Sequence, residues 1–237
     1  MTDTPQTCRW QVYATADALQ ADAVRIISAA AQSAINARGE FHMVLAGGST
    51  PRAVYESLAT IRTDWSAWHI YFGDERCLPP NHTERNSSMA LQAWLRHVNI
   101  PHMQIYMIPA ELGAVRAAQE YARLLQGLDS FDLVLLGLGE DGHTASLFPG
   151  QQWGADPGGP AVLAVHDAPK PPPERVSLSA WRLSRARQVM FLVAGAGKRD
   201  AVRKWRAGDT IPARAITPEA GVEVLADSAA AGENGES

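Results

Sequence analysis

The sequence of 237 residues has few cysteines, no long apolar run and no excess of positive charge. Its two cysteines, Cys8 and Cys77, lie far apart and without metal-ligand spacing, which argues against a disulfide framework and a cysteine zinc site. We expect both to be reduced thiols, as in a cytoplasmic protein. No segment approaches the roughly 18 to 20 apolar residues of a membrane span, and the polar N-terminus does not resemble a signal peptide. We therefore expect the protein to stay in the compartment where it is made, without membrane contact.

The charge balance limits the partners in a similar way. The chain has 21 Lys and Arg against 25 Asp and Glu, a formal net charge of −4, and 46% of its residues are hydrophobic. Without a general basic field, nucleic acid is not an expected partner, and an anionic small molecule would need local positive groups. The apolar content is enough for a sizeable core. We expect one domain over residues 1–237, with flexible ends at 1–7 and 228–237, as a monomer or a small homo-oligomer.

Apolar runs alternate with amphipathic stretches along most of the chain. In the stretch 17–39, apolar residues recur at helical spacing and Gly39 stands where a C-terminal cap is expected, which predicts a helix. The continued alternation predicts a Rossmann-like, doubly wound α/β fold, in which a mostly parallel sheet has helices on both faces. Residues 148–162 are rich in Pro and Gly and are predicted to be a loop.

Four of the predicted strands end in glycine-rich or charged turns. The segments that contain these turns are 44–51, 70–76, 135–143 and 192–198. The carboxyl ends of parallel strands share one edge of a sheet, and open α/β folds bind their ligands at that edge. The four turns are therefore expected to line one crevice.

The first of these turns, AGGSTP, is a candidate anion site. Gly47 and Gly48 allow close approach of the backbone, and Ser49 or Thr50 can cap the following helix and donate to a phosphate. A capped turn without a ligand is the alternative. Lys198 opens another helix, where the helix dipole disfavours a cation, so a bound anion would explain its position. A solvated surface lysine is the alternative there.

The segment 73–88 places charged side chains at another strand end. Asp74 and Arg76 follow the strand directly, and Asn86 lies in the polar loop beyond them. Arg76 could clamp a phosphate or polarise a carbonyl. A salt bridge within the loop is the alternative interpretation of this arginine.

The segment GLGEDGH has the G-x-G-x-x-G spacing of a dinucleotide-binding turn. Glu140 and Asp141 lie inside it and would repel a pyrophosphate, and Pro149 leaves too little room for the long helix that such a turn requires. A nicotinamide cofactor is therefore not expected. His143 instead follows a strand end beside carboxylates that can orient its imidazole, as suits a group that accepts a proton and returns it. A structural histidine is the alternative.

Taken in order, five segments resemble the 6-phosphogluconolactonase family: LAGGSTP, YFGDERCLPPNHTERNSSMA, FDLVLLGLGEDGHTASLFPG, PPPERVSLS and VAGAGK. The resemblance runs from about Leu45 to Lys198. It implies a single-domain Rossmann-like fold related to glucosamine-6-phosphate deaminase and ribose-phosphate isomerase. It also implies hydrolysis of 6-phospho-D-glucono-1,5-lactone to 6-phospho-D-gluconate in the oxidative pentose phosphate pathway, with neither metal nor cofactor.

The resemblance assigns roles to individual residues. His143 becomes the general base that activates water, and Asp141 or Glu140 would orient it. The predicted substrate-binding residues are Gly47, Gly48, Ser49, Thr50, Asp74, Arg76, Asn86, Arg175 and Lys198. Arg76, Arg85, Arg175 and Lys198 are the candidates for holding the phosphate. The chain departs from the family pattern at Arg85 and Ala194, where Ser and Thr are frequent.

Two alternatives to the lactonase remain. The related deaminases share the glycine turn and the DGH histidine, but they typically carry a carboxylate where this chain has Phe148, so a deaminase would lack part of its proton relay. A non-catalytic sugar-phosphate sensor could use the same cradle. Such regulators usually carry a DNA-binding module, and no basic helix-turn-helix segment precedes residue 41.

Overall fold

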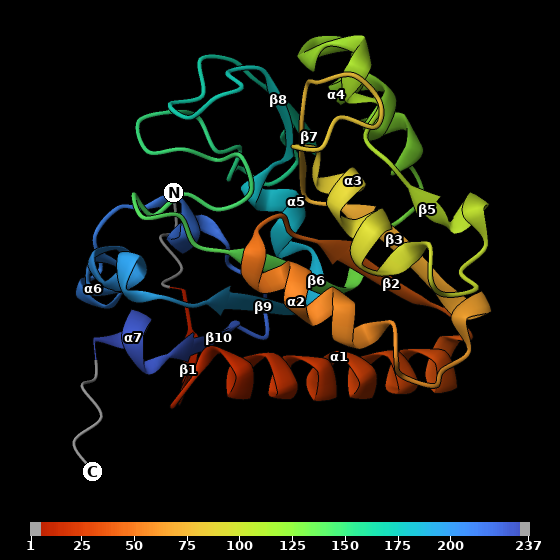
Figure 1. Ribbon diagram of the computed structural model, residues 1–237. Helices are drawn as coiled ribbons and strands as arrows, with labels where there is room; N and C mark the ends of the chain where they lie inside the picture. The colour runs from red at the N-terminus through yellow and green to blue at the C-terminus, as the bar shows by residue number, and fades with distance from the viewer. Residues whose placement is uncertain (1–5, 233–237) are drawn as a thin grey trace.

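The computed structural model describes residues 6–232, and its central feature is a seven-stranded sheet (Figure 1). In spatial order the strands are β1 (Cys8–Tyr13), β10 (Val222–Asp227), β9 (Ala186–Val193), β6 (Phe131–Gly137), β2 (Phe41–Leu45), β3 (Trp68–Phe72) and β5 (Ile105–Tyr106). Every neighbouring pair is parallel. The central strand β6 is buried along nearly its whole length, as expected for a strand covered on both faces.

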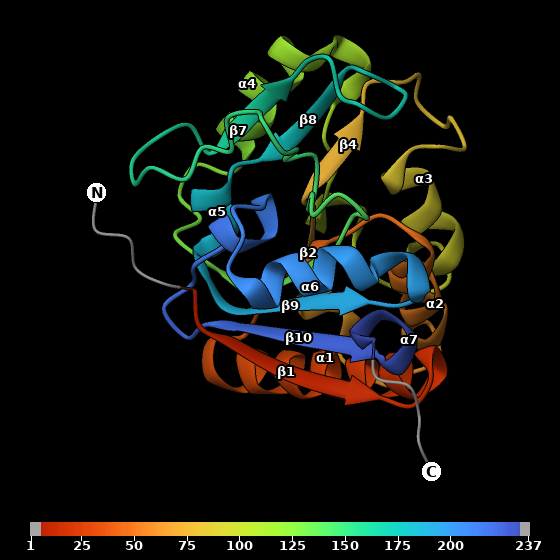
Figure 2. The same cartoon turned by 90° about the vertical axis from the view of Figure 1, so that its left-hand side faces the viewer.

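Helices cover both faces of this sheet. In both views α1 (Ala16–Arg38) and α2 (Ser49–Leu58) lie on one face and α6 (Arg199–Ala207) lies on the other (Figure 1, Figure 2). The remaining α-helices of residues 6–232 are α3 (Asn86–Ala90), α4 (Ala114–Leu124), α5 (Ala180–Ser184) and α7 (Ser228–Ala231). Helix α1 ends at Gly39, whose φ of 82° is left-handed, as the sequence predicted. The predicted doubly wound α/β fold is thus confirmed.

A second, three-stranded antiparallel sheet lies above β9 and β10 in the view of Figure 2, and its strand β4 follows the carboxyl end of β3 in the chain. Its strands are β4 (Asp74–Arg76), β8 (Arg175–Leu178) and β7 (Val162–Val165). Gly73 joins β3 to β4: its N–H donates to Leu45 O, and its carbonyl accepts from Leu178 N. The sequence pattern predicted one sheet only, so this second sheet was not expected.

A continuous hydrophobic core joins the two sheets. Trp68 and Trp94 are among its largest fully buried side chains, and Val176 and Leu178 of β8 belong to the same cluster. Between Phe148 and Ala161 the chain forms neither helix nor strand, which confirms the loop predicted there. Among the helices of residues 6–232, none has the length and apolar character needed to cross a membrane.

The described parts of the two ends are ordered. The Gln6 side chain donates to the carbonyls of Ala213 and Ile216. Residues 228–231 form α7, in which Ala230 N donates to the Asp227 side chain. These contacts give the described parts of both ends defined positions, and the flexibility of the ends stays a prediction. The rest of that prediction falls on residues 1–5 and 233–237, which lie outside the described residues.

Candidate active site

A cavity of about 350 Å³ opens at the carboxyl edge of the large sheet. It lies beside β2 and β6, the point from which the chain winds outward in opposite directions, where doubly wound folds bind ligands. Residues of all four turns singled out above line it, together with part of the connection between β7 and β8. The turns thus line one crevice.

Most of the proposed site residues face this cavity. Those that line it are Gly47, Gly48, Asp74, Arg76, Asn86, His143, Arg175 and Lys198. Ser49, Thr50, Glu140 and Asp141 are not among its lining residues. Gly48 is the N-cap residue of α2 and no side chain caps this helix, so the cap predicted from Ser49 or Thr50 is wrong.

Asp141 holds the imidazole of His143. Nδ1 of His143 lies 2.5 Å from Asp141 Oδ1, and the His143 backbone N–H donates to the same oxygen over 3.2 Å. A neutral imidazole that donates from Nδ1 to a carboxylate keeps Nε2 as its acceptor. Among residues 6–232, Nε2 has no hydrogen-bond partner. His143 lines the cavity, so the free nitrogen is available to a bound molecule.

Burial and the contact between the two side chains together set the protonation states of this pair. Desolvation lowers the pKa of His143 below its ordinary value, and the charge of Asp141 opposes that effect without cancelling it. Burial alone would raise the pKa of Asp141, but the charge and hydrogen bonds of His143 outweigh it, so this pKa is lowered. The arrangement favours a neutral histidine beside an ionised carboxylate near pH 7.

Glu140 has a different environment. Its side chain is exposed, and its Oε1 would lie 2.9 Å from a Cβ added at Gly197, in the turn that precedes α6. The proposed orientation of His143 by Glu140 is therefore wrong. Asp141 provides it, because the turn places that carboxylate beside the ring.

Two positions must be glycine because neighbouring side chains occupy the space that a Cβ would fill. A Cβ on Gly139 would lie 2.0 Å from Nδ1 of His143, and a Cβ on Gly47 would lie 2.1 Å from Oδ1 of Asn86. Both distances are far inside van der Waals contact. The glycines therefore admit the imidazole and the amide against the backbone, in addition to shaping the turns.

A buried carboxylate lies in the wall of the cavity. Asp74 is 6% exposed, and its Oδ1 accepts from Asn86 Nδ2 over 3.0 Å while its Oδ2 accepts from Ser146 Oγ over 2.6 Å. Asn86 is fixed in turn by Glu75, which accepts its backbone N–H over 2.8 Å. These bonds hold Asp74 and Asn86 in one orientation.

The arginines differ in what their guanidinium groups contact. Arg76 donates from Nη1 to Glu84 O and forms no ion pair with residues 6–232, so the loop salt bridge offered as its alternative is absent. Arg85 does not line the cavity. It pairs with Glu75 at 3.4 Å and Glu111 at 3.0 Å, which removes it from the candidates for the phosphate.

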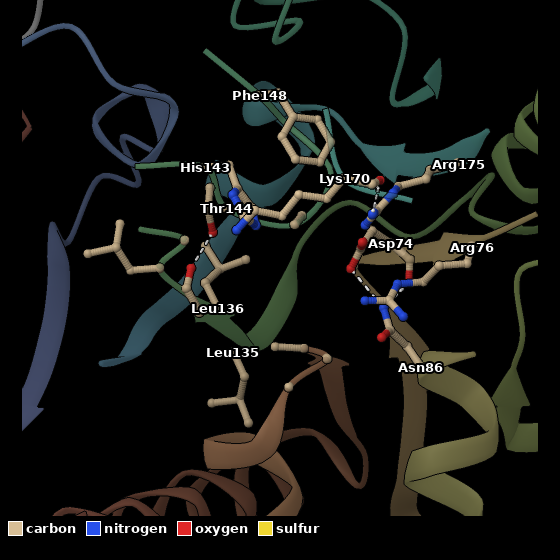
Figure 3. A pocket seen from close by; sticks show the side chains of 18 of the residues that line it. Asp74, Arg76, Asn86, Leu135, Leu136, His143, Thr144, Phe148, Lys170 and Arg175 are labelled. Carbon is tan, nitrogen blue, oxygen red and sulfur yellow. Dashed lines mark hydrogen bonds between the residues drawn. The ribbon is translucent and has the colours of Figure 1, made fainter. Parts of the chain in front are cut away.

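Thr144, Phe148 and Lys170 are among the lining residues that were not assigned to the site from the sequence. In Figure 3 the side chain of Lys170 extends across the cavity toward His143 and Thr144. The segment PKPPP could have indicated Lys170 from the sequence, because prolines restrict the backbone on both sides of this lysine. Within the described part of the chain, no group of three His, Cys, Asp or Glu could hold a metal ion.

Comparison with known proteins gives one consistent family. Residues 14–225 match the family model described as glucosamine-6-phosphate isomerases/6-phosphogluconolactonase. The 6-phosphogluconolactonase of Synechocystis is 38% identical over 214 residues, which cover 85% of this chain and 87% of that protein. The human GDH/6PGL endoplasmic bifunctional protein is 40% identical over 185 residues, 73% of this chain, but the match spans only 23% of that protein.

The fold has close structural neighbours. The 6-phosphogluconolactonase of Trypanosoma brucei superposes with a TM-score of 0.84 at 30% identity, over 96% of this chain and 98% of that one. A monomeric glucosamine-6-phosphate deaminase superposes with a TM-score of 0.81 at 19% identity, over 96% of this chain and all of that one. The shared fold therefore does not separate these two activities. Side chains of the site must do so.

Proposed function

Because this chain belongs to the glucosamine-6-phosphate isomerase/6-phosphogluconolactonase family, we propose that it hydrolyses 6-phospho-D-glucono-1,5-lactone to 6-phospho-D-gluconate in the pentose phosphate pathway. The observation that carries this proposal is the pair of His143 and Asp141, with Nδ1 bound to a carboxylate at 2.5 Å and Nε2 free at a cavity. The finer proposals are a cytoplasmic location, no metal requirement, one domain, and a monomer or small homo-oligomer.

In the proposed reaction His143 acts first as a base and then as an acid. Nε2 takes a proton from a water molecule as its oxygen bonds to the lactone carbonyl carbon, which gives a tetrahedral oxyanion. When the carbonyl re-forms, the bond to the ring oxygen breaks and the imidazolium returns its proton to that oxygen. Asp141 stabilises the imidazolium between the two steps.

The phosphate would bind remote from the reacting bond. The backbone of Gly47 and Gly48 leads into the N-terminus of α2, where free N–H groups and the helix dipole favour an anion. Arg76 and Lys198 also line the cavity and supply the positive charge. Binding at this distance from the carbonyl would position the lactone ring relative to His143.

Phe148 argues against the deaminase alternative. By the family resemblance it stands where the deaminases typically carry a carboxylate. It is 1% exposed, and its ring packs against His143 at a centroid distance of 4.9 Å. An apolar ring cannot relay a proton. The lactonase is therefore the function that the site supports best.

Acid release from freshly made 6-phosphogluconolactone, corrected for spontaneous hydrolysis, tests the proposal. We expect the His143→Ala variant to lose about a hundredfold to ten-thousandfold in kcat. His102→Ala, which removes an exposed histidine, is the matched control and should keep the native rate. EDTA should leave the native rate unchanged. A native rate equal to spontaneous hydrolysis would exclude the lactonase and favour the sensor, and ammonia release from glucosamine 6-phosphate would favour the deaminase.

A further inference from the structure

The connection between β7 and β8, residues 166–174, forms a strap beside the cavity. Its base is closed by His166 Nδ1 and Glu174 Oε1 at 2.8 Å and by Ala168 N, which donates to Pro173 O over 3.0 Å. Prolines at 169 and 171–173 leave the strap few N–H donors of its own. Lys170 is the strap residue that carries a charge over the cavity.

Arg175, the first residue of β8, binds three successive carbonyls of the strap. Its Nε donates to Pro172 O over 3.1 Å, and its Nη2 donates to Lys170 O over 2.8 Å and to Pro171 O over 3.2 Å. The residue is 5% exposed. Both hydrogens of Nη2 and the hydrogen of Nε are thus used within the protein.

This hydrogen bonding restricts what else Arg175 can bind. A bidentate clamp on a phosphate needs two parallel N–H donors, from Nε with Nη2 or from Nη1 with Nη2. Both pairs include Nη2, which has no hydrogen left. The guanidinium of Arg76, by contrast, forms one hydrogen bond within residues 6–232, from Nη1 to Glu84 O, so the second hydrogen of Nη1 and those of Nη2 remain for such a clamp.

Arg175 is also linked to the proposed base. Its guanidinium lies over the ring of Phe148 at 5.4 Å, and the same ring also packs against His143. Asp74 and Arg76 are the charged groups that act most strongly on Arg175, with opposite signs. Lys170 is the cation among the charged groups that shift the pKa of His143 most strongly, and it lowers that pKa. The Lys170 side chain also lines the cavity and extends toward His143 in Figure 3, and the proposed oxyanion would form beside His143.

We propose that Arg175 is a positioning residue: it fixes the strap so that Lys170 faces the reacting carbonyl beside His143, and it does not clamp the substrate phosphate. This inference rests on the proposed function. It replaces the expectation that Arg175 holds the phosphate, and it assigns to Lys170 the stabilisation of the oxyanion.

Three variants and three measurements test this assignment. The variants are Arg175→Gln, Arg76→Gln as the matched arginine, and Lys170→Gln. The measurements are hydrogen exchange of peptides covering 166–174, the kcat for lactone hydrolysis, and competitive inhibition by inorganic phosphate. Arg175→Lys, which keeps the charge but loses the fork, replaces Arg175→Gln if the latter does not fold.

For Arg175→Gln we expect about tenfold faster exchange in the strap, because its backbone acceptors lose their donors, and about a tenfold lower kcat. Phosphate inhibition should stay within about twofold of native, because no phosphate ligand is removed. Arg76→Gln should do the reverse: phosphate inhibition weakens and strap exchange stays native. Lys170→Gln should lower kcat with native strap exchange.

Two outcomes would overturn the proposal. In the first, Arg175→Gln weakens phosphate inhibition as much as Arg76→Gln does while strap exchange is unchanged, which makes Arg175 a phosphate ligand. In the second, strap exchange rises but kcat is native, so the strap positions nothing. A native protein without lactonase activity would instead overturn the proposed function, and the exchange measurement would still decide whether Arg175 fixes the strap.

Discussion

The protonation of His143 is set by two opposing contributions. Burial favours the neutral imidazole, and the Asp141 carboxylate favours the charged one, with burial the larger effect. A base must be neutral to act, so kcat/KM should fall as the pH decreases through the pKa of His143. Because that pKa is lowered, we expect the midpoint of the acid limb to lie below 6.5 in a pH profile of kcat/KM.

Removing the Asp141 charge should move this midpoint in a known direction. Asp141→Asn deletes the contribution that raises the pKa of His143, so the acid limb should shift to a still lower pH. The same change should lower kcat by about a hundredfold or more, because the tautomer with a free Nε2 is no longer enforced. A midpoint that moves to higher pH would contradict this account of the pair. Glu140→Gln, which removes a carboxylate that faces Gly197, is the matched control and should leave the midpoint in place.

The backbone beneath the imidazole gives a second prediction at this scale. In Gly139→Ala the new methyl group would meet Nδ1 of His143 at 2.0 Å, so the ring must move away from Asp141. We expect a loss in kcat comparable to that of His143→Ala, about a hundredfold or more. In Gly137→Ala the methyl group meets no atom within 4 Å, and the loss should be much smaller. Equal losses would show that the turn itself, and not the contact with His143, limits activity.

The position of a single residue was predictable where the local sequence determines it, and not where contacts between distant segments determine it. His143 lies in the turn that follows β6, which ends at Gly137, so its position at the sheet edge was predictable. The choice between Asp141 and Glu140 depended on the dihedral angles of the turn, including Gly142 at φ 89°, and no spacing rule gives these. Arg175 and Lys170 acquire their roles through contacts between the strap and β8. No local pattern distinguishes such an arginine from a phosphate ligand.

At the scale of elements, α3 depends on one buried carboxylate. Glu75 is 1% exposed and accepts the backbone N–H groups of Asn86 and Ser87, each over 2.8 Å. It also pairs with the buried Arg85 at 3.4 Å. Glu75 therefore fixes the start of α3, which places Asn86 in the cavity wall. It also compensates the buried positive charge of Arg85.

Glu75→Ala should be costly for this reason. Removal of one partner of a buried pair leaves the other uncompensated, so we expect the free energy of unfolding to fall by about 3 kcal/mol, measured by urea denaturation. Glu111→Ala removes the partly exposed partner of the same arginine and should cost about 1 kcal/mol or less. Equal costs would mean that the N–H groups of α3 do not depend on Glu75.

The elements themselves were predictable where periodicity is strong. Helix α1 spans more than five turns with an apolar stripe and a glycine cap, so both its existence and its end followed from the sequence. The small sheet did not follow, because β4 pairs with β8 about a hundred residues later, and antiparallel pairing across that separation has no local signal. Arg76 and Arg175 face each other in this pairing. The sequence alone therefore did not predict that Arg76 and Arg175 would lie together at the cavity.

At the scale of the whole molecule, the proposed anion site exists only in the folded state. Gly48 and Lys198 are about 150 residues apart in the sequence, yet both line the same cavity. They meet there because the chain winds outward in both directions from β2 and β6, which brings the two turns to one edge of the sheet. The turn that carries Lys198 is anchored by Asp227, whose carboxylate accepts Gly195 N over 3.0 Å. A ligand that binds here stabilises the native state against an unfolded chain in which these groups are far apart.

Inorganic phosphate should therefore raise the thermal midpoint of unfolding. At about a hundred times its Kd the expected gain is about 2.7 kcal/mol, which corresponds to an increase of roughly 5 to 10 °C for a chain of this size. Phosphate also stabilises proteins without specific binding, because it is excluded from their surfaces. Arg76→Gln is the control, and both proteins are compared in phosphate and in chloride of equal ionic strength. The variant should keep the increase in thermal midpoint that is due to solvent exclusion and lose most of the increase that is due to specific binding. An equal increase in both proteins would show that phosphate acts through solvent exclusion alone and that Arg76 does not bind it.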